Sequence, residues 1–256
     1  MGVANHRSIG WSVATALHRE GAELAFTYRR DRSKENLFKL LDRIGGASRF
    51  LTFPCDVSED AQVEAAFTGL GAQWDRLDIV IHSIANAERS DLTGSFTGIS
   101  RTGFGHALGT SAYSLISVTR RATPMLEAAG GGSIIAMTYD AVRKVVPGYN
   151  VMAVAKAALE TEVRYLAAEL GPLHIRVNAI SAGPIRTRSS RAIRGISKLR
   201  SVAETVSPLR TNATQDDVSA AAVFLSSDLS RAVTGNIIFV DGGLHLVGTP
   251  VGPPSA

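Results

Sequence analysis

The chain has 256 residues, and at roughly one domain per 100–200 residues this length allows one large domain or two small ones. Apolar residues make up 45% of the sequence and charged residues 20%, which is typical of a globular protein and excludes global disorder. The net charge of +4 is mild and lacks the dense basic stripe of a nucleic-acid-binding protein. No apolar run approaches the roughly 18 residues of a membrane span. The single cysteine, Cys55, excludes an internal disulfide and favours a cytoplasmic protein.

Short β-branched runs alternate with helical patterns along the chain. The predicted strands are 23–28, 49–53, 79–82, 133–137, 175–180 and 236–240. The predicted helices are 8–19, 34–44, 61–73, 102–126, 152–170 and 216–225. This alternation is typical of right-handed βαβ units in a parallel sheet. We therefore predict an α/β protein with a single doubly wound Rossmann-type domain over 1–247 and a Pro/Gly-rich tail over 248–256.

The first strand of such a fold is missing from this sequence. A dinucleotide-binding fold normally begins with a strand that leads into a glycine turn and a helix, but here the turn starts at Gly2. In the strand order 3-2-1-4-5-6 that strand is central, and its loss leaves two neighbours unpaired. We expect that Met1 is an internal methionine and that about ten more residues precede it, enough for one strand.

The first glycine turn is a candidate site for the phosphates of a dinucleotide. Gly2 opens the turn, and Ser8 and Ile9 stand where the helix begins. Ser8 would cap the helix, and its first amides would carry partial positive charge toward a pyrophosphate. Alone, the pattern is more typical of an ordinary helix cap.

Two arginines favour NADPH as the cofactor. An NAD-dependent enzyme usually carries a carboxylate at the end of the next strand, but here Arg29 and Arg30 follow that strand and Ser33 lies close behind. Arginine accommodates a 2′-phosphate, although a solvated surface run explains the same residues. Further candidate cofactor contacts follow the third and fourth strands, each weak alone: Asp56, Val57, Ser83, Ile84 and Ala85.

The strongest candidate pair is Tyr149 and Lys156. Seven residues make nearly two helical turns, so we expect both side chains on one helix face. A lysine there can lower the pKa of the phenol and hold the nicotinamide ribose, while the phenol donates a hydrogen bond to a substrate oxygen. The alternative is a surface lysine beside a half-buried tyrosine.

Together these motifs resemble the short-chain dehydrogenase/reductase superfamily, and within it the divergent branch of bacterial enoyl-acyl-carrier-protein reductases. The similar stretches are 2–9, 18–28, 55–57, 82–85, 149–156, 176–187 and 240–243. Three features are typical of that branch: the sequence Ala-Gly-Pro-Ile-Arg-Thr over 182–187, the wide spacing from Tyr149 to Lys156, and a second tyrosine, Tyr139. Most other members of the superfamily carry a serine before the tyrosine and a tighter spacing.

The resemblance implies a reaction and a set of site residues. Tyr149 would stabilise the enolate oxygen of a trans-2-enoyl thioester as hydride reaches Cβ, Lys156 would bind ribose, and Tyr139 would line the acyl pocket. Ile185 and Thr187 would flank the nicotinamide, and Ala87 would touch the thioester. The implied cofactor is NADPH, with NADH possible, and the substrate is an acyl thioester on acyl carrier protein or coenzyme A. The implied assembly is a homotetramer that uses the helices over 102–126 and 152–170.

Several departures from the family pattern surround the expected acyl pocket. They are Asn86, Gly109-Thr110, Asp140-Ala141 and Arg188. The segment 186–200 also carries six basic residues and no acid, and could meet an acidic carrier protein or the phosphates of coenzyme A. A solvated helix face explains that segment equally well.

Two other functions stay open at this point. A carbonyl reductase uses the same tyrosine and lysine pair, and a non-catalytic NADP-binding paralogue would explain the missing strand and the altered pocket. The six histidines show no paired spacing such as H-E-x-x-H, so we predict no metal site.

Overall fold

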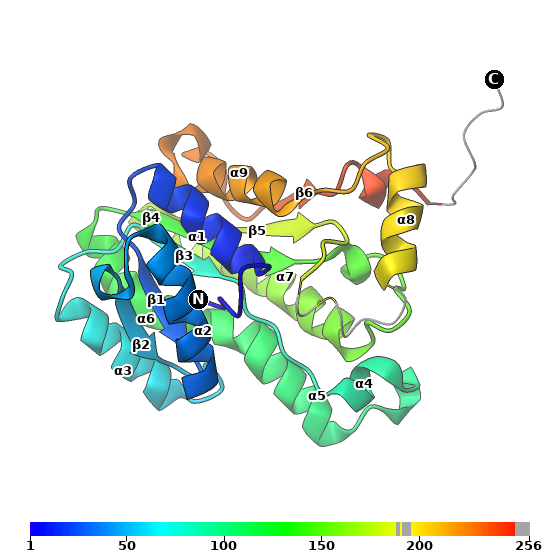
Figure 1. Ribbon diagram of the computed structural model, residues 1–256, viewed down its shortest axis with the longest axis horizontal. Coiled ribbons are helices and arrows are strands. Elements are labelled where there is room, and N and C mark those ends of the chain that lie inside the picture. Colours follow the sequence, from blue (N-terminus) through cyan, green and yellow to red (C-terminus); the bar gives the residue numbers. More distant parts are fainter. Residues whose placement is uncertain (188–189, 191–195, 249–256) are drawn as a thin grey trace.

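Parallel strands enclosed by helices make up the computed structural model of the protein, which describes residues 1–187, 190 and 196–248 (Figure 1). Its strands are β1 (Ala25–Tyr28), β2 (Leu51–Pro54), β3 (Ile79–His82), β4 (Gly132–Thr138), β5 (Ile175–Ala182) and β6 (Ile237–Val240). Its α-helices are α1 (Ile9–Arg19), α2 (Asp31–Leu41), α3 (Asp60–Gly71), α4 (Arg89–Thr93), α5 (Arg101–Leu108), α6 (Ser114–Ala128), α7 (Val151–Leu170), α8 (Ile196–Val206) and α9 (Gln215–Ser226).

The strands form two parallel sheets in place of one. β1 pairs with β2, and β3, β4, β5 and β6 pair in that order. Helices connect successive strands, as parallel pairing requires. The predicted α/β class with a parallel sheet is confirmed. Most of the predicted tail, from residue 249 onward, lies outside the described residues.

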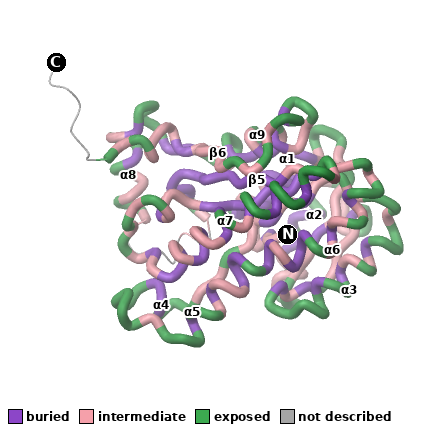
Figure 2. Tube along the Cα trace, turned by 180° about the vertical axis from the view of Figure 1, so that it is seen from behind, coloured by how far each residue is buried: buried purple, intermediate pink, exposed green. Residues whose placement is uncertain are grey.

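Helices cover both faces of the larger sheet because side chains alternate along each strand. On β4, Ile134 and Ala136 pack into a core shared with α3, α6 and α7. Their neighbours Ile135 and Met137 face the opposite way, into a core shared with α1 and α9. Figure 2 shows the resulting buried stretch along β5, whose residues are nearly all buried. Apolar runs without polar alternation, such as 133–137, therefore mark strands enclosed on both faces.

The residues predicted as one long helix over 102–126 are helical throughout, but the stretch is not α-helical along its whole length. α5 ends at Leu108, and a π-helical turn, Gly109–Tyr113, separates it from α6. Glycine is a weak helix former, and three glycines lie between residues 103 and 109. The sequence pattern gives no indication of α4, and α8 overlaps only the end of the segment 186–200 for which a helix face was considered. α8 lies beyond the carboxyl ends of β5 and β6 (Figure 1).

Within the described residues, no strand precedes α1. The backbone of Met1 nevertheless bonds to β3: its amine donates to the Ile81 carbonyl at 2.8 Å, and the Ser83 amide donates to the Met1 carbonyl at 3.3 Å. The sheet is divided between β1 and β3, where the predicted strand order puts the first strand.

Candidate active site

The predicted site residues gather beyond the carboxyl ends of the strands. Such an edge is where ligands bind in open α/β sheets. The turn 2–8 leads into α1, Arg29 and Arg30 follow β1, and Asp56 follows β2. The segment 83–87 follows β3. Tyr139 follows β4, Tyr149 and Lys156 come from the start of α7, and Ile185 and Thr187 follow β5. Residues far apart in sequence thus converge because the strands are parallel.

Gly2 lies where only glycine fits. Its φ is +92°, and a Cβ on this residue would stand 2.0 Å from the carbonyl oxygen of Ser83. Gly10 packs against the same residue, since a Cβ there would lie 3.3 Å from the Ser83 side chain. The turn therefore lies close against the loop that follows β3.

The prediction that the Ser8 side chain caps α1 is wrong in its detail. Ser8 holds the N-cap position, but its hydroxyl accepts hydrogen bonds from the amides of Ala4 and Asn5, each at 3.0 Å. The hydroxyl thus closes the turn. The first amides of α1, at Ile9 and Gly10, have no carbonyl within the helix to bond and remain available for an anion.

Arg29 pairs with Asp56, another candidate cofactor contact predicted from the sequence. The Nε atom of Arg29 lies 2.9 Å from a carboxylate oxygen of Asp56, and Ser58 donates to the other oxygen from its hydroxyl at 2.7 Å. Burial opposes ionisation of Asp56, but the Ser58 hydrogen bonds and the charges of Arg29 and Arg30 outweigh it and lower the pKa. Arg30 is exposed at the start of α2, and Ser33 lies in the first turn of that helix.

Lys156 lies within α7, whereas Tyr149 precedes the helix. α7 begins at Val151, and Asn150, with φ of +35°, turns the chain between the tyrosine and the helix. Tyr149 is 8% exposed, and its ring centroid lies 5.1 Å from that of Tyr139. The buried Lys156 amine donates to the Met137 carbonyl at 2.7 Å. The two side chains therefore do not share one helix face, as the seven-residue spacing had predicted.

The pKa of the Tyr149 phenol also differs in direction from the prediction, which had the lysine lower it. Burial raises the pKa of Tyr149, and the nearby Tyr139 raises it further. Burial lowers the pKa of Lys156 to about 8, while Glu160 and Glu162 act in the opposite direction. The lysine therefore does not lower the pKa of the phenol here, and Tyr149 stays a neutral hydrogen-bond donor at ordinary pH.

Tyr139 lies beside a polar cluster that sequence reasoning did not find. Burial raises the pKa of Tyr139 to about 12, and the carboxylates of Asp140 and Asp241 contribute. Asp140 pairs with Lys144 at 3.4 Å, and the Lys144 amine donates to three carbonyl oxygens near the carboxyl end of the chain, those of Leu244, His245 and Val247. The departure at Asp140 thus serves to position the turn after β6.

A second polar pair lies beside Ala87. The side-chain amide nitrogen of Asn86 lies 2.9 Å from Nε2 of His106 on α5, and the Asn86 backbone amide donates to Ser111 in the π-helical turn. Ala87 packs against the cluster that holds Tyr149 and Met152. Asn86, which departs from the family pattern, therefore has a hydrogen-bond partner in His106, twenty residues away in the sequence.

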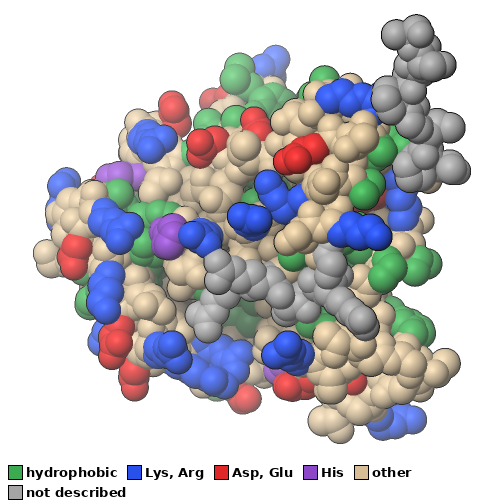
Figure 3. Space-filling view, turned by 45° about the vertical axis from the view of Figure 1, so that its right-hand side comes forward, with side chains coloured by type: hydrophobic (Ala, Val, Ile, Leu, Met, Phe, Trp, Pro, Cys, Tyr) green, Lys and Arg blue, Asp and Glu red, His purple; other side chains and the backbone are tan. Residues whose placement is uncertain are grey.

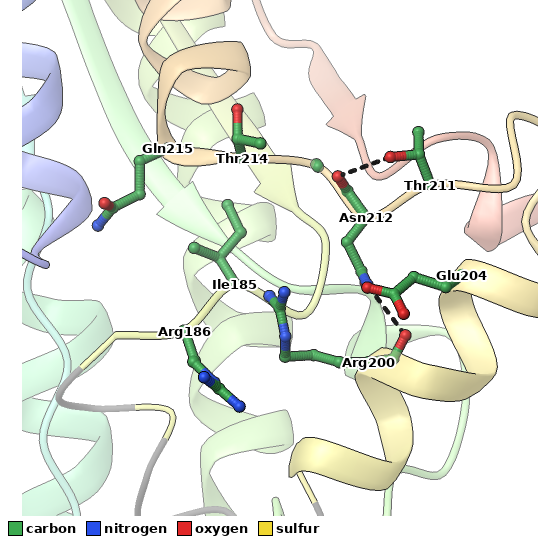
Figure 4. A pocket seen from close by; sticks show the side chains of 9 residues that line it. Ile185, Arg186, Arg200, Glu204, Thr211, Asn212, Thr214 and Gln215 are labelled. Atoms are coloured by element: carbon green, nitrogen blue, oxygen red, sulfur yellow. Dashed lines mark hydrogen bonds between the residues drawn. The ribbon is translucent and has the colours of Figure 1, made fainter.

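Ile185 lines a cavity of about 290 Å³ beyond β5, and Thr187 follows it two residues later (Figure 4). Ile185 is buried, and the Thr187 hydroxyl accepts a hydrogen bond from the Ser190 amide at 2.9 Å. Arg186 and Arg200 also line the cavity. On its far side Gln215, at the start of α9, donates to the Arg7 carbonyl, which joins this side of the site to the first turn.

The predicted basic segment is only partly described. Arg186 and Lys198 are exposed, whereas Arg200 donates to the Pro184 carbonyl at 2.9 Å and so turns inward. Arg188, Arg191 and Arg194 lie outside the described residues. Figure 3 shows Lys and Arg side chains across the middle of one face of the molecule.

Residues 1–187, 190 and 196–248 hold no group of three His, Cys, Asp or Glu side chains suited to a metal ion. No helix in this part of the chain is long and apolar enough to cross a membrane.

The sequence matches a protein-family model and many curated proteins. The model described as "Enoyl-(Acyl carrier protein) reductase" matches residues 2–245. The enoyl-acyl-carrier-protein reductase (NADH) FabI of Synechocystis sp. is 47% identical over 96% of this chain and 95% of its own length. The enzyme named as NADPH-dependent from Staphylococcus aureus is 45% identical over the same shares.

Solved structures agree with these sequence relatives. The Bacillus cereus enoyl-acyl carrier protein reductase, crystallised with NADP⁺ and indole naphthyridinone, superposes with a TM-score of 0.94 at 46% identity. The match covers 97% of this chain and 96% of that one. The Anaplasma phagocytophilum enzyme in complex with NAD superposes with a TM-score of 0.91 at 42% identity, over 98% of this chain and 94% of that one.

Proposed function

Because the chain belongs to the enoyl-(acyl carrier protein) reductase family, we propose that it reduces the double bond of a trans-2-enoyl thioester on acyl carrier protein, with NADPH as reductant. The observation that carries the proposal is the arrangement around Lys156. Its amine lies 2.7 Å from the Met137 carbonyl of β4 and 3.5 Å from the Ile84 carbonyl after β3, and the buried Tyr149 lies just before the helix that carries this lysine. A ribose-binding cation and a neutral phenol therefore lie at one edge of the sheet.

The residues present suit a dinucleotide phosphate. The first amides of α1 favour a pyrophosphate, and the close fit of Gly2 against Ser83 holds the turn against the sheet. The guanidinium of Arg30 and the hydroxyl of Ser33 suit a 2′-phosphate. The other predicted contacts, Asp56, Val57, Ser83, Ile84, Ala85, Ile185 and Thr187, border the same edge. When bound, the nicotinamide supplies the hydride that adds to Cβ.

Tyr149 stabilises the charge that this addition creates. As the Cβ–H bond forms, electron density moves through Cα to the thioester oxygen, and the phenol donates a hydrogen bond to the resulting enolate. Its raised pKa keeps the proton on the phenol, so the donor is preorganised. Cα then takes a proton from solvent as the thioester carbonyl re-forms, and the saturated thioester is complete. Tyr139, whose ring lies against Tyr149, and Ala87 border the acyl chain.

Turnover of NADPH with short and long trans-2-enoyl thioesters, each on acyl carrier protein and on coenzyme A, tests the proposal. Replacing the phenol in Tyr149→Phe should lower kcat by about 10²–10³-fold with little change in the Kd for NADPH, since one oxyanion donor is lost. Tyr165→Phe, which alters a tyrosine that is 75% exposed, is the matched control. Reduction of ketones alone, with no turnover of enoyl thioesters, would favour the carbonyl-reductase alternative. NADPH binding without any turnover would favour the non-catalytic one.

Arg30 tests the cofactor preference. Arg30→Ala should raise the Kd for NADPH by about 10–100-fold, the effect of losing a hydrogen bond to a charged group, and leave that for NADH nearly unchanged. Arg32→Ala removes a neighbouring exposed guanidinium and should alter neither value. Equal losses for both cofactors would contradict a 2′-phosphate site at Arg30.

We further propose that the enzyme is a cytoplasmic homotetramer. The lone, buried Cys55 suits a reducing compartment. The helices predicted as interfaces carry exposed aromatic side chains, with Tyr165 75% and Tyr113 41% exposed, and such surface is typical of an interface. Light scattering should give four times the chain mass of 27.1 kDa, and Tyr165→Glu should dissociate the assembly. Exposed Arg186 and Lys198 suit an acidic carrier protein.

A further inference from the structure

The segment 83–87 contacts the two residues on which the proposed reaction depends. It is irregular backbone between β3 and α4. The Ile84 carbonyl lies 3.5 Å from the Lys156 amine, and Ala87 packs against the cluster that holds Tyr149. Because irregular backbone has no hydrogen-bond ladder of its own, the position of this segment depends on bonds to other elements.

Three hydrogen bonds hold Asn86 against α5 and the π-helical turn that follows it. The Ser111 hydroxyl accepts from the Asn86 backbone amide at 3.0 Å and donates to the Asn86 carbonyl at 3.1 Å. The side-chain amide nitrogen of Asn86 lies 2.9 Å from Nε2 of His106, and since an amide nitrogen can only donate, Nε2 accepts. Ser111 is fully buried, which strengthens bonds to its hydroxyl. We call Asn86, His106 and Ser111 the residue-86 clamp.

The π-helical turn explains how two helical residues five positions apart reach the same partner. In a regular α-helix such residues lie about 140° apart around the axis, on different faces. The turn Gly109–Tyr113 bonds residues that are five positions apart, which reduces this angle. His106 and Ser111 can therefore both face Asn86. Turns of this kind are common at functional sites.

The clamp lies behind the wall of the expected acyl pocket. Ala87 and Leu108 pack against the cluster that holds Tyr149. His106 comes two residues before Leu108, about 200° around the helix, so its side chain points away from that cluster. Asn86 bonds to His106 and so lies on the same far side. These two side chains are therefore positioning residues, not catalytic ones.

We propose that the residue-86 clamp positions the segment 83–87 and so sets the gap between Ala87 and Tyr149 in which the thioester reacts. The inference rests on the proposed function of this site. A phenol stabilises the enolate oxygen only if that oxygen lies within hydrogen-bond distance. A displacement of about 1 Å costs on the order of 10²-fold in rate, even when the reacting groups are unchanged. The clamp therefore affects the rate of reduction without touching the reacting atoms.

Ser111→Ala tests the clamp through kcat. The change removes both bonds to the Asn86 backbone and nearly keeps the side-chain volume. The kcat for a trans-2-enoyl thioester should fall by about 10–100-fold, because the thioester is misplaced. The Kd for NADPH should change by no more than about threefold, since the turn 2–8 and Arg30 bind the phosphates.

Ser117→Ala is the matched control. Ser117 is also buried, lies on α6, and donates its hydroxyl to Asp60 of α3 at 2.6 Å. Loss of this bond should lower the Tm about as much as Ser111→Ala does. The kcat should stay within about twofold of that of the unmodified protein, because this bond lies between α3 and α6 and not at the segment 83–87.

The side-chain bond of the clamp has its own test. His106→Leu should lower kcat by about 3–10-fold, the effect of one hydrogen bond. His106→Gln keeps an acceptor oxygen and should restore most of the rate. Asn86→Ala removes the same bond from its other end, so the double variant with His106→Leu should be no slower than the slower single variant. Losses that multiply would contradict the pairing.

Amide exchange at Asn86 gives a readout that does not depend on activity. This amide loses its acceptor in Ser111→Ala and should exchange at least about tenfold faster there than in Ser117→Ala. If Ser111→Ala keeps its kcat within about twofold, or if Ser117→Ala loses as much, the clamp does not position the segment. If the unmodified protein reduces no enoyl thioester, the proposed function is wrong. Equal exchange rates in the two serine variants would then overturn the clamp as well.

Discussion

Several residues at the site have hydrogen-bond or ion-pair partners that their sequence neighbours do not predict. Ser8 closes a turn that its position suggests it should cap, and Asp56 binds Arg29. The phenol of Tyr149 is kept neutral by burial, with no contribution from Lys156. In each case the residue was identified from sequence, but its partner was supplied by another element.

Gly2→Ala is the residue change with the clearest steric consequence. Its Cβ would lie 2.0 Å from the Ser83 carbonyl oxygen, so the turn must move, and φ of +92° adds strain. We expect a loss of about 1–3 kcal/mol in the free energy of unfolding and a rise of at least about tenfold in the Kd for NADPH. Gly71→Ala in α3 is the control, because nothing lies within 4 Å of the added Cβ. It should change the free energy of unfolding by no more than a few tenths of a kcal/mol and leave the Kd for NADPH unchanged.

At the scale of elements, the strand cores were predictable and the helix details were not. β3 has its predicted bounds, and the other strands differ by one to two residues at their ends. The π-helical turn between α5 and α6 is bonded to a different segment, since the Ser111 hydroxyl donates to the Asn86 carbonyl, and within the turn the Ser114 hydroxyl donates to the Thr110 carbonyl. A periodic pattern cannot reveal such a break, because it records only which face is apolar.

Lys144 should anchor the turn after β6 more strongly than Asp140 does. Lys144→Met removes bonds to three carbonyl oxygens, and we expect unfolding in urea to show a loss of about 1–3 kcal/mol. Asp140→Asn removes only a partly exposed ion pair and should cost about 0–1 kcal/mol. Equal losses in the two variants would contradict a role for the carbonyl bonds.

Across the whole molecule, a buried histidine links the core to acid stability. His82 is fully buried at the end of β3, and its Nε2 lies 2.8 Å from the Ser114 hydroxyl. Burial lowers its pKa to about 3, and the charges of Lys156 and of the amino terminus contribute. An unfolded histidine titrates near pH 6.5, so between these two values the unfolded state holds the proton. Stability from this group is therefore present above about pH 6.5 and is lost as the pH falls toward 3.

His82→Gln, which cannot titrate, should flatten this pH dependence. Between pH 7 and pH 4.5 the unmodified protein should lose about 1–3 kcal/mol more of its unfolding free energy than the variant does. Urea unfolding at several pH values measures the two slopes, so a constant loss from the substitution itself does not matter. His106→Gln, at a partly exposed position, is the control. Parallel curves for His82→Gln and the unmodified protein would contradict the prediction.

The sequence by itself determined the α/β class, the position of the strands and the candidate residues of the site, because apolar periodicity and short motifs at strand ends are local properties. Tertiary structure decided which of these residues meet: Asn86 with His106, Asp140 with Lys144, and Met1 with Ile81. It also decided the protonation of Tyr149 and Lys156, because burial is a property of everything packed around a group.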